Sequence, residues 1–307
     1  MKIMLFFFGI IAIIFNLSCK EIVAPPEKSL NPDNSKNTPG WFHSDNLFGN
    51  RYINISLPKN YNSENTRKYH TVYLLDANWY FDGSNTRIGN SGVVGIINRL
   101  VEEELIPDVI LVGIGNLDTH GTNMRGFDFH SQKTDNFLKF ITEELIPIVD
   151  KRFNTDTNNL TGRTLIGHSS AAYFTMLVFF QYDSINHNYF HNFITLSGDF
   201  VKPLMDLFDE EITFFEKIGS QGEVNMALFL GVGSLEEDRF LYSFTTMRDV
   251  LISRQYNNLK LGSRIYLNHN HGSYIAEAIR DGLIFLFHES HTTKEETNWK
   301  SEVLVSQ

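Results

Sequence analysis

The sequence contains little cysteine and no excess of positive charge, and both shortages exclude kinds of function. Cys19 is the only cysteine among 307 residues, so no internal disulfide can form and the usual spacings of thiolate metal sites are excluded. Lysine and arginine number 26 against 36 aspartate and glutamate residues, which gives a formal net charge of -10. Nucleic acids and anionic lipid surfaces attract basic proteins instead. We therefore expect no nucleic-acid partner and a fold that depends on its hydrophobic core.

The sequence also offers no apolar run suited to crossing a membrane near its start. Residues 3–15 are apolar and follow Lys2, but a spanning helix needs about 20 such residues. This pattern is typical of a signal peptide, here residues 1–18. Leu17-Ser18-Cys19 resembles a bacterial lipobox, although Asn16 departs from the usual aliphatic residue. We predict a cell-envelope protein, lipid-anchored through Cys19 in the outer membrane. A plain secretory signal with an incidental cysteine is the alternative.

Proline is scarce, and its distribution indicates the domain organisation. The chain has 8 prolines, and four of them fall among polar residues soon after Cys19: Pro25, Pro26, Pro32 and Pro39. We interpret residues 19–40 as a flexible tether. The rest has an ordinary globular composition, 42% hydrophobic and 20% charged over the whole chain. We expect one domain at residues 41–290, followed by a polar tail at 291–307.

Strand and helix patterns alternate along this domain. Residues 51–57 alternate apolar and polar side chains, as a half-exposed strand does. Short apolar runs typical of buried strands occur at residues 71–75, 109–114, 164–166, 193–196, 226–232 and 265–267. Helical spacing occurs at residues 93–105, 135–153 (with a kink expected at Pro147), 171–180 and 274–287. The sequence therefore predicts an α/β fold with a mostly parallel sheet, helices on both faces and chemistry at the carboxyl ends of the strands.

Ser169 lies in Gly167-His168-Ser169-Ser170-Ala171, directly between a predicted strand and a predicted helix. This is the context of a nucleophile elbow, in which a serine occupies a sharp turn and its neighbours two residues away are small. The turn also places the serine at a helix amino terminus, where amides favour developing negative charge. A chance match in an ordinary strand-to-helix turn is the alternative. A base and an acid at suitable positions later in the chain would favour the nucleophile elbow over a chance match.

The base should be a histidine that follows the acid in sequence. His271 precedes Gly272 and Ser273 on a loop between the last strand and the closing helix, and it is our candidate. His269 is its main competitor. We expect a surface or structural role for the remaining histidines considered: His168, His187, His191, His288 and His291.

The acid should follow a strand, as residues 233–238 do. Glu236 comes first after the turn and is preferred over Glu237 and Asp238, with Asp199 as an outside candidate. A solvated acidic loop is the alternative. In this scheme His271 takes the proton of Ser169 and passes it to the leaving alcohol, while Glu236 fixes the imidazole tautomer. The amide of Ser170 and one from residues 76–79 would bind the oxyanion.

Six motifs in order resemble the putative esterase (esterase D-like) family of α/β hydrolases, which includes siderophore and feruloyl esterases. They are residues 72–77, Arg125-Gly126-Phe127-Asp128, residues 140–153, the Ser169 turn, residues 233–236 and residues 271–273. Ala77 and Ala171 replace glycines of the family pattern. The resemblance implies an α/β-hydrolase fold, assigns the second oxyanion amide to Asn78, and implies no metal or cofactor.

The substrate is expected to be a small carboxylic ester. Trp79 and Tyr80 leave the oxyanion strand and should line the rim of the pocket together with Arg125. Packing within the loop is the alternative role for these aromatic residues. An acyl sugar, a feruloyl-type ester and a siderophore ester all fit. Acyl transfer by the same three residues, and ligand binding without catalysis, are the competing functions.

Overall fold

The computed structural model describes residues 40–83, 88, 92–130, 134–157, 162–181, 189–201, 206–287 and 303–305. The predicted signal peptide, Cys19 and the tether up to residue 39 lie outside these residues, as does the predicted tail except for 303–305. Among the described helices, none has the length and apolar character needed to cross a membrane.

Within the described residues, nine strands form one sheet in the order β1-β2-β4-β3-β5-β6-β7-β8-β9. β1 and β2 pair with each other in antiparallel fashion, and β2 is antiparallel to β4, whereas the pairs from β4 to β9 are parallel. The mostly parallel sheet predicted from the sequence is confirmed. The strands are β1 (Gly40–Ser44), β2 (Gly49–Ser56), β3 (His70–Leu75), β4 (Val109–Ile114), β5 (Arg163–His168), β6 (Asn192–Leu196), β7 (Glu223–Gly233), β8 (Asn257–Tyr266) and β9 (Val303–Val305).

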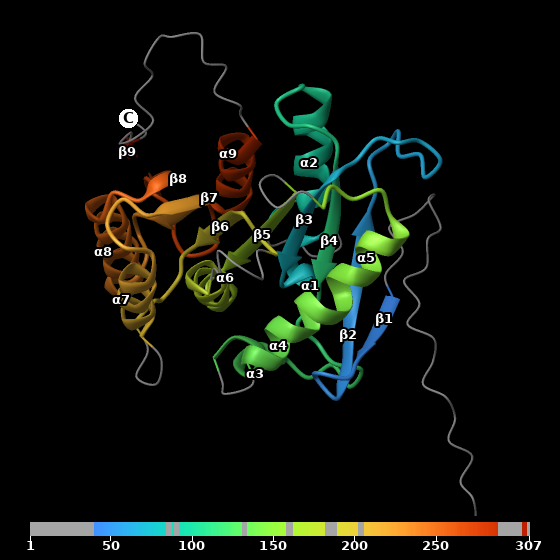
Figure 1. Cartoon of the computed structure of the whole chain (residues 1–307), viewed down its shortest axis with the longest axis horizontal. Coiled ribbons are helices and arrows are strands. Elements are labelled where there is room, and N and C mark those ends of the chain that lie inside the picture. The colour runs from blue at the N-terminus through green and yellow to red at the C-terminus, as the bar shows by residue number, and fades with distance from the viewer. Residues whose placement is uncertain are drawn as a thin grey trace, which may run out of the picture.

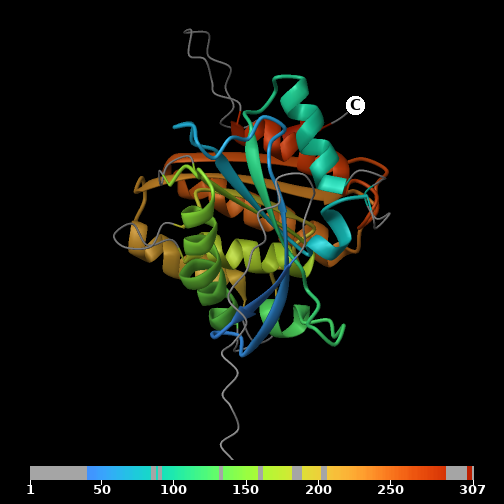
Figure 2. The ribbon, with the colours of Figure 1, turned by 90° about the vertical axis from the view of Figure 1, so that its right-hand side faces the viewer.

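Helices cover both faces of this sheet (Figures 1 and 2). One buried cluster joins α1, α2 and α9 to the sheet, and a second joins the helices from α3 to α8 to its other face. All six residues of β4 are buried, with Leu111 in the first cluster and Ile110 and Val112 in the second. The helices are α1 (Ala77–Tyr80), α2 (Gly92–Glu102), α3 (Arg125–His130), α4 (Thr134–Lys139), α5 (Ile146–Arg152), α6 (Ser170–Phe180), α7 (Leu207–Ile218), α8 (Asp238–Arg254) and α9 (Ile275–Phe287).

The kink expected at Pro147 takes another form. A π-helical turn, η2 (Phe140–Leu145), joins α4 to α5, and Pro147 lies in the first turn of α5. A proline cannot donate to the carbonyl four residues before it, and its ring collides with that carbonyl in a regular helix. The wider π turn lies where this conflict arises and lets the helical path continue.

The parallel strands bring polar residues to one edge of the sheet. The residue that follows each of β3, β5 and β6 is a non-glycine with positive φ: Asp76 at 55°, Ser169 at 60° and Ser197 at 52°. Such backbone is costly for residues with a Cβ. The chain therefore turns sharply away from three neighbouring strands at the same edge, where the predicted site residues also lie.

Candidate active site

Ser169 occupies the turn between β5 and α6, as the sequence predicts, with φ 60° and ψ -120°. Its amide donates to the carbonyl of Leu196 on the neighbouring strand at 2.8 Å, and its own carbonyl accepts from the amide of Ala172 at 3.0 Å. These bonds hold the strained turn in place on both sides. The Ser169 side chain itself remains half-buried rather than enclosed.

The two small neighbours of Ser169 have different roles. A Cβ at Gly167 would lie 2.3 Å from the carbonyl oxygen of Ala171 and 2.4 Å from Thr175 Oγ1, so no side chain fits there. Ala171, which replaces a glycine of the family pattern, is fully buried and is accommodated. β5 and α6 therefore lie too close together for any side chain at Gly167. At Ala171 there is room for a methyl group.

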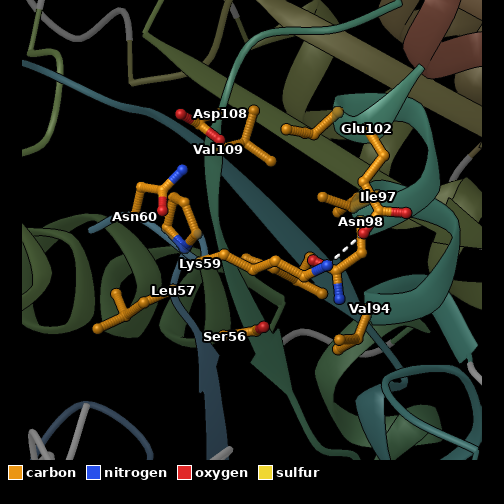
Figure 3. Close-up of a pocket in the computed structure, with 13 residues that line it drawn as sticks. Ser56, Leu57, Lys59, Asn60, Val94, Ile97, Asn98, Glu102, Asp108 and Val109 are labelled. Atoms are coloured by element: carbon orange, nitrogen blue, oxygen red, sulfur yellow. Dashed lines mark hydrogen bonds and ion pairs between the residues drawn. The ribbon is translucent and has the colours of Figure 1, made fainter. Parts of the chain in front are cut away.

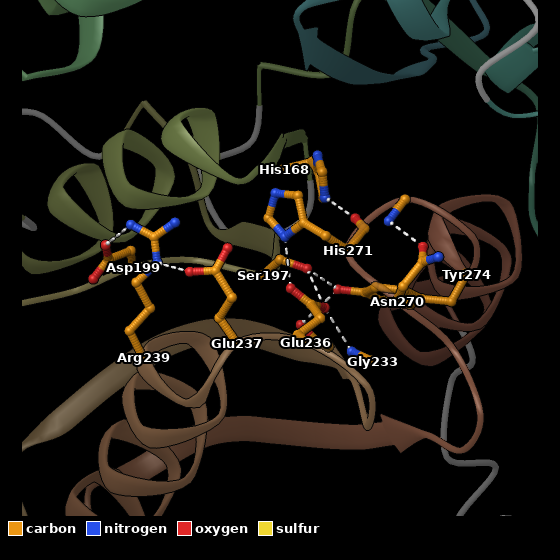
Figure 4. Close-up of polar contacts among 12 residues, drawn as sticks. His168, Ser197, Asp199, Gly233, Glu236, Glu237, Arg239, Asn270, His271 and Tyr274 are labelled. Carbon is orange, nitrogen blue, oxygen red and sulfur yellow. Dashed lines mark hydrogen bonds and ion pairs between the residues drawn. The ribbon is translucent and has the colours of Figure 1, made fainter.

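His271 and Glu236 lie together, although 35 positions separate them in the sequence. Nδ1 of His271 is 2.6 Å from Oε2 of Glu236 (Figure 4). A carboxylate accepts, so Nδ1 carries the hydrogen and Nε2 is left with a lone pair. The His271 side chain is 39% exposed, whereas that of Glu236 is fully buried. The imidazole thus has one fixed nitrogen and an open side.

The buried carboxylate of Glu236 is satisfied by two further donors. Oε1 accepts from the amide of Gly233 and from Oγ of Ser197, both at 2.7 Å. Such bonds compensate for the desolvation of a buried charge. Burial raises the pKa of Tyr274, so its neutral hydroxyl can donate, and it lies 2.5 Å from Ser197 Oγ and 3.1 Å from the carbonyl oxygen of Gly231. Ser197 and Tyr274 were not predicted; a serine directly after a buried strand was the available signal for the first.

The competing acids make other contacts. Glu237 and Asp238 are exposed, and Glu237 pairs with Arg239 at 3.0 Å. Asp199, three residues after β6, also pairs with Arg239, at 3.4 Å. Among the four acids considered, only Glu236 is hydrogen-bonded to His271.

The competing histidines are placed away from the Glu236 carboxylate. His269 bonds through Nδ1 to Ser273 Oγ at 3.0 Å. His191 precedes β6 at the opposite edge of the sheet, and burial lowers its pKa to about 4. His187, His288 and His291 lie outside the described residues.

Of the surface and structural roles expected for His168, its position fits the structural one, and its side chain returns to the site. It is buried, its Nε2 lies 2.8 Å from the carbonyl oxygen of His271, and its ring centroid is 4.7 Å from that of His271. Among the described residues, no hydrogen bond joins Ser169 Oγ to His271 directly. The elbow and the loop that carries His271 are joined instead through the residue next to Ser169.

The predicted oxyanion donors lie on the first turns of two helices. Ser170 is the first residue of α6, where helical amides lack an intrahelical acceptor. The loop expected at residues 76–79 is mostly the one-turn helix α1, which places Asn78 in its first turn. The Oδ1 of Asn78 accepts from the amide of Asn116 at 2.9 Å, which ties α1 to the segment after β4.

Arg125 spans the space between the oxyanion strand and the elbow. Its Nε lies 3.1 Å from Asp76 Oδ1, its Nη2 donates to the carbonyl of His168 at 3.3 Å, and its guanidinium lies 4.9 Å from the ring centre of Trp79. Tyr80 was expected at the rim, but it is buried and its hydroxyl lies 3.0 Å from His168 Nδ1. Packing explains Tyr80, whereas Trp79 and Arg125 are only partly buried.

Asp128, the other charged residue of the Arg125 motif, has a structural role. Asp128 binds Arg51 of β2 through both carboxylate oxygens, at 2.6 and 3.1 Å, and both side chains are buried. Burial raises the pKa of Asp128 to about 6 despite the guanidinium beside it. The pair fixes α3, and hence Arg125, against the antiparallel side of the sheet.

A pocket of about 200 Å³ lies elsewhere, between the end of β2, α2 and the start of β4 (Figure 3). Ser56 pairs with Leu111, so this is the edge where the parallel strands begin. An ion pair between Lys59 and Glu102 lies beside it. The pocket is therefore separate from Ser169 and His271, which lie at the opposite edge.

Comparison with known proteins identifies the family and the fold. A family model described as "Putative esterase" matches residues 44–225, which is more than half of the chain. No curated protein matches the sequence. The BES protein from Bacillus cereus has a similar structure, with 23% sequence identity, coverage of 85% of this chain and 98% of that chain, and a TM-score of 0.67.

Two further solved structures share the fold. The siderophore hydrolase EstA from Aspergillus nidulans has 18% identity, covers 84% of this chain and 96% of its own, and has a TM-score of 0.64. An IroE-like serine hydrolase from Shewanella oneidensis has 20% identity, coverage of 82% and 80%, and a TM-score of 0.62. The fold and the family match together show that this chain belongs to the putative esterase family and is a carboxylic ester hydrolase with the α/β-hydrolase fold.

Proposed function

We propose that Ser169, His271 and Glu236 form a catalytic triad that hydrolyses carboxylic esters through an acyl-enzyme. The 2.6 Å contact between His271 Nδ1 and Glu236 Oε2 carries the proposal. It orients a histidine whose other nitrogen is free to act as a base, on the sheet edge where the strained serine lies. The order Ser, Glu, His along the chain is the order of this hydrolase class.

The reaction follows from the protonation states. His271 Nε2 takes the hydroxyl proton of Ser169 as Oγ attacks the ester carbonyl carbon, and the carbonyl oxygen becomes an oxyanion. Collapse of this intermediate breaks the bond to the alcohol oxygen, which receives the proton from His271. Water then attacks the acyl-enzyme by the same route and releases the acid and Ser169. Glu236 stabilises the imidazolium in both halves while remaining ionised.

The oxyanion is assigned to the amides of Ser170 and Asn78. Ser170 is the first residue of α6 and Asn78 lies in the one-turn helix α1, both at the same sheet edge. The amino terminus of α6 favours negative charge. The contact of Asn78 Oδ1 with Asn116 would fix the position of the second amide. Two fixed donors of this kind stabilise the transition state more than the ground state.

The substrate class is proposed from the groups beside the elbow. Trp79 supplies an aromatic face and Arg125 a partly buried cation that stacks on it. An ester with an aromatic or oxygen-rich acyl group fits this pair. The similar structures include proteins named siderophore hydrolase and ferulic acid esterase, which have substrates of this kind in their names.

A fluorophosphonate probe tests the proposed nucleophile. The folded chain should be labelled in a 1:1 ratio, because an activated serine attacks phosphorus and His271 assists the loss of the leaving group. Mass spectrometry of peptides should place the adduct on Ser169, and heat-denatured protein should remain unlabelled. Absence of labelling, or an adduct on another serine, would contradict the triad. A panel of sugar, feruloyl and siderophore esters then ranks the substrate classes by kcat/KM.

We further propose that Cys19 carries a lipid anchor that holds the domain at the outer membrane. The support is the short apolar run at residues 3–15, which is followed closely by the only cysteine of the chain. In a bacterial host, the full chain should incorporate radiolabelled palmitate and sediment with membranes, and Cys19→Ser should lose both properties. Ser169→Ala is the matched control: it should keep the label, which separates a lipid anchor from an acyl-enzyme. An unlabelled wild-type chain would contradict the anchor.

A further inference from the structure

We propose that His168 is a positioning residue that holds the base loop against the nucleophile elbow in a single tautomeric state. The inference rests on the triad proposed above. His168 lies directly before Ser169 in the chain, and its side chain contacts both the loop of His271 and helix α1. It thus links the three segments that are assigned the nucleophile, the base and one oxyanion amide.

The contacts of the His168 ring define its tautomer. Nε2 lies 2.8 Å from the main-chain carbonyl oxygen of His271, which can only accept, so Nε2 carries a hydrogen. Nδ1 lies 3.0 Å from the hydroxyl of Tyr80, which can donate to it. A neutral ring with its proton on Nε2 satisfies both contacts. The main-chain carbonyl of His271 therefore sets the tautomer, and Tyr80 can complete it by donating to Nδ1.

The neutral state matters because the two imidazoles are neighbours. Their ring centroids are 4.7 Å apart, and His271 must become a cation during each catalytic half-reaction. A second positive charge at this distance would oppose that step. His168 is only 7% exposed, which penalises a charged ring, and Tyr80 can donate to Nδ1 only when the ring is neutral.

Other contacts confine the same assembly. Phe240 packs on the His271 ring, with centroids 4.5 Å apart, and Arg125 donates to the carbonyl of His168 at 3.3 Å. The imidazole of His271 is therefore bounded by Phe240, by His168 and by Glu236 at Nδ1. Because these three contacts restrict the rotation of the ring, the direction in which Nε2 points depends on the position of the loop main chain. The bond from His168 fixes that main chain at His271 itself.

Two amide variants separate the hydrogen bond from the bulk of the side chain. In His168→Gln the amide nitrogen reaches about as far as Nε2 and can donate to the His271 carbonyl. In His168→Asn the amide nitrogen reaches only as far as Nδ1 of histidine, so it cannot donate to the His271 carbonyl. We expect His168→Asn to lower kcat for a p-nitrophenyl ester by about 100-fold, the effect of displacing a reacting group by about 1 Å, with KM changed less than about threefold. His168→Gln should recover at least about tenfold of that loss.

A spectroscopic measurement distinguishes positioning from general stability. The proton in the short His271–Glu236 bond should give a far-downfield NMR signal, assigned by its loss in Glu236→Gln. The signal should stay in His168→Gln and shift or broaden in His168→Asn, at temperatures where both variants are folded. Equal kcat values in the two variants, or an unchanged signal in His168→Asn, would overturn the proposal. Should Ser169→Ala retain turnover, the triad itself would fail, which is a separate result.

Discussion

Ser169→Ala is expected to abolish ester cleavage while leaving the fold intact. Removing the nucleophile of a serine triad lowers kcat by about 10⁵- to 10⁶-fold, and the residual rate comes from oxyanion binding alone. The structure gives a reason to expect normal folding. Ser169 is half-buried, and alanine has the same Cβ and therefore the same cost at φ 60°. The main-chain bonds to Leu196 and Ala172 do not involve the hydroxyl.

The measurement is kcat for a short p-nitrophenyl ester, together with the thermal unfolding midpoint of the same preparation. The midpoint should shift by no more than about 2 °C, a small fraction of the stability of a domain this size. Retained turnover in a folded variant would refute the serine assignment.

Glu236→Gln is expected to lower kcat by about 10⁴-fold, because it forces the wrong tautomer on His271. The amide has one accepting oxygen, but the carboxylate it replaces accepts from three groups. Gly233 and Ser197 both donate to the position of Oε1, so the amide oxygen belongs there. The NH₂ group then faces His271 Nδ1, which must accept, and the imidazole proton moves to Nε2. A protonated Nε2 cannot take the proton of Ser169.

Glu237→Gln is the matched control for this variant. Glu237 is the next residue, and its side chain is 71% exposed and faces Arg239 rather than His271. Its substitution should leave kcat within about twofold, since an exposed ion pair contributes little. Comparable losses in the two variants would show that the charge of the loop matters, instead of the bond to His271, and would contradict the assigned acid.

Parts of the molecule could be predicted because the information is local. The run at residues 109–114 is buried on both faces and coincides with β4, and the small residues around Ser169 predict its turn. β8 was predicted only at residues 265–267, because most of its side chains are exposed or half-buried and form no apolar run. Helix α8 was missed because residues 238–254 combine polar and apolar side chains without a clear apolar stripe.

The contacts around the proposed triad could not be predicted because they join distant segments. Ser197 and Glu236 are 39 positions apart, and Tyr80 and His168 are 88 apart. A sequence pattern can indicate that a polar residue follows a strand, but not which neighbour it meets across the edge. His168 was expected to have a surface or structural role, because its side chain should leave the turn in a different direction from that of Ser169. The role proposed for it depends on the loop of His271, 103 positions later.

The left-handed residues Asp76, Ser169 and Ser197 have a consequence for how this protein can evolve or be engineered. Each has a side chain at a positive φ that glycine would adopt at lower free energy. The rest of the domain must therefore compensate for the stability lost at these three positions. Replacements that make the protein more heat-resistant are therefore expected to concentrate at this rim and to come with slower turnover. Gains without such a trade-off should be sought far away, on the antiparallel margin of the sheet.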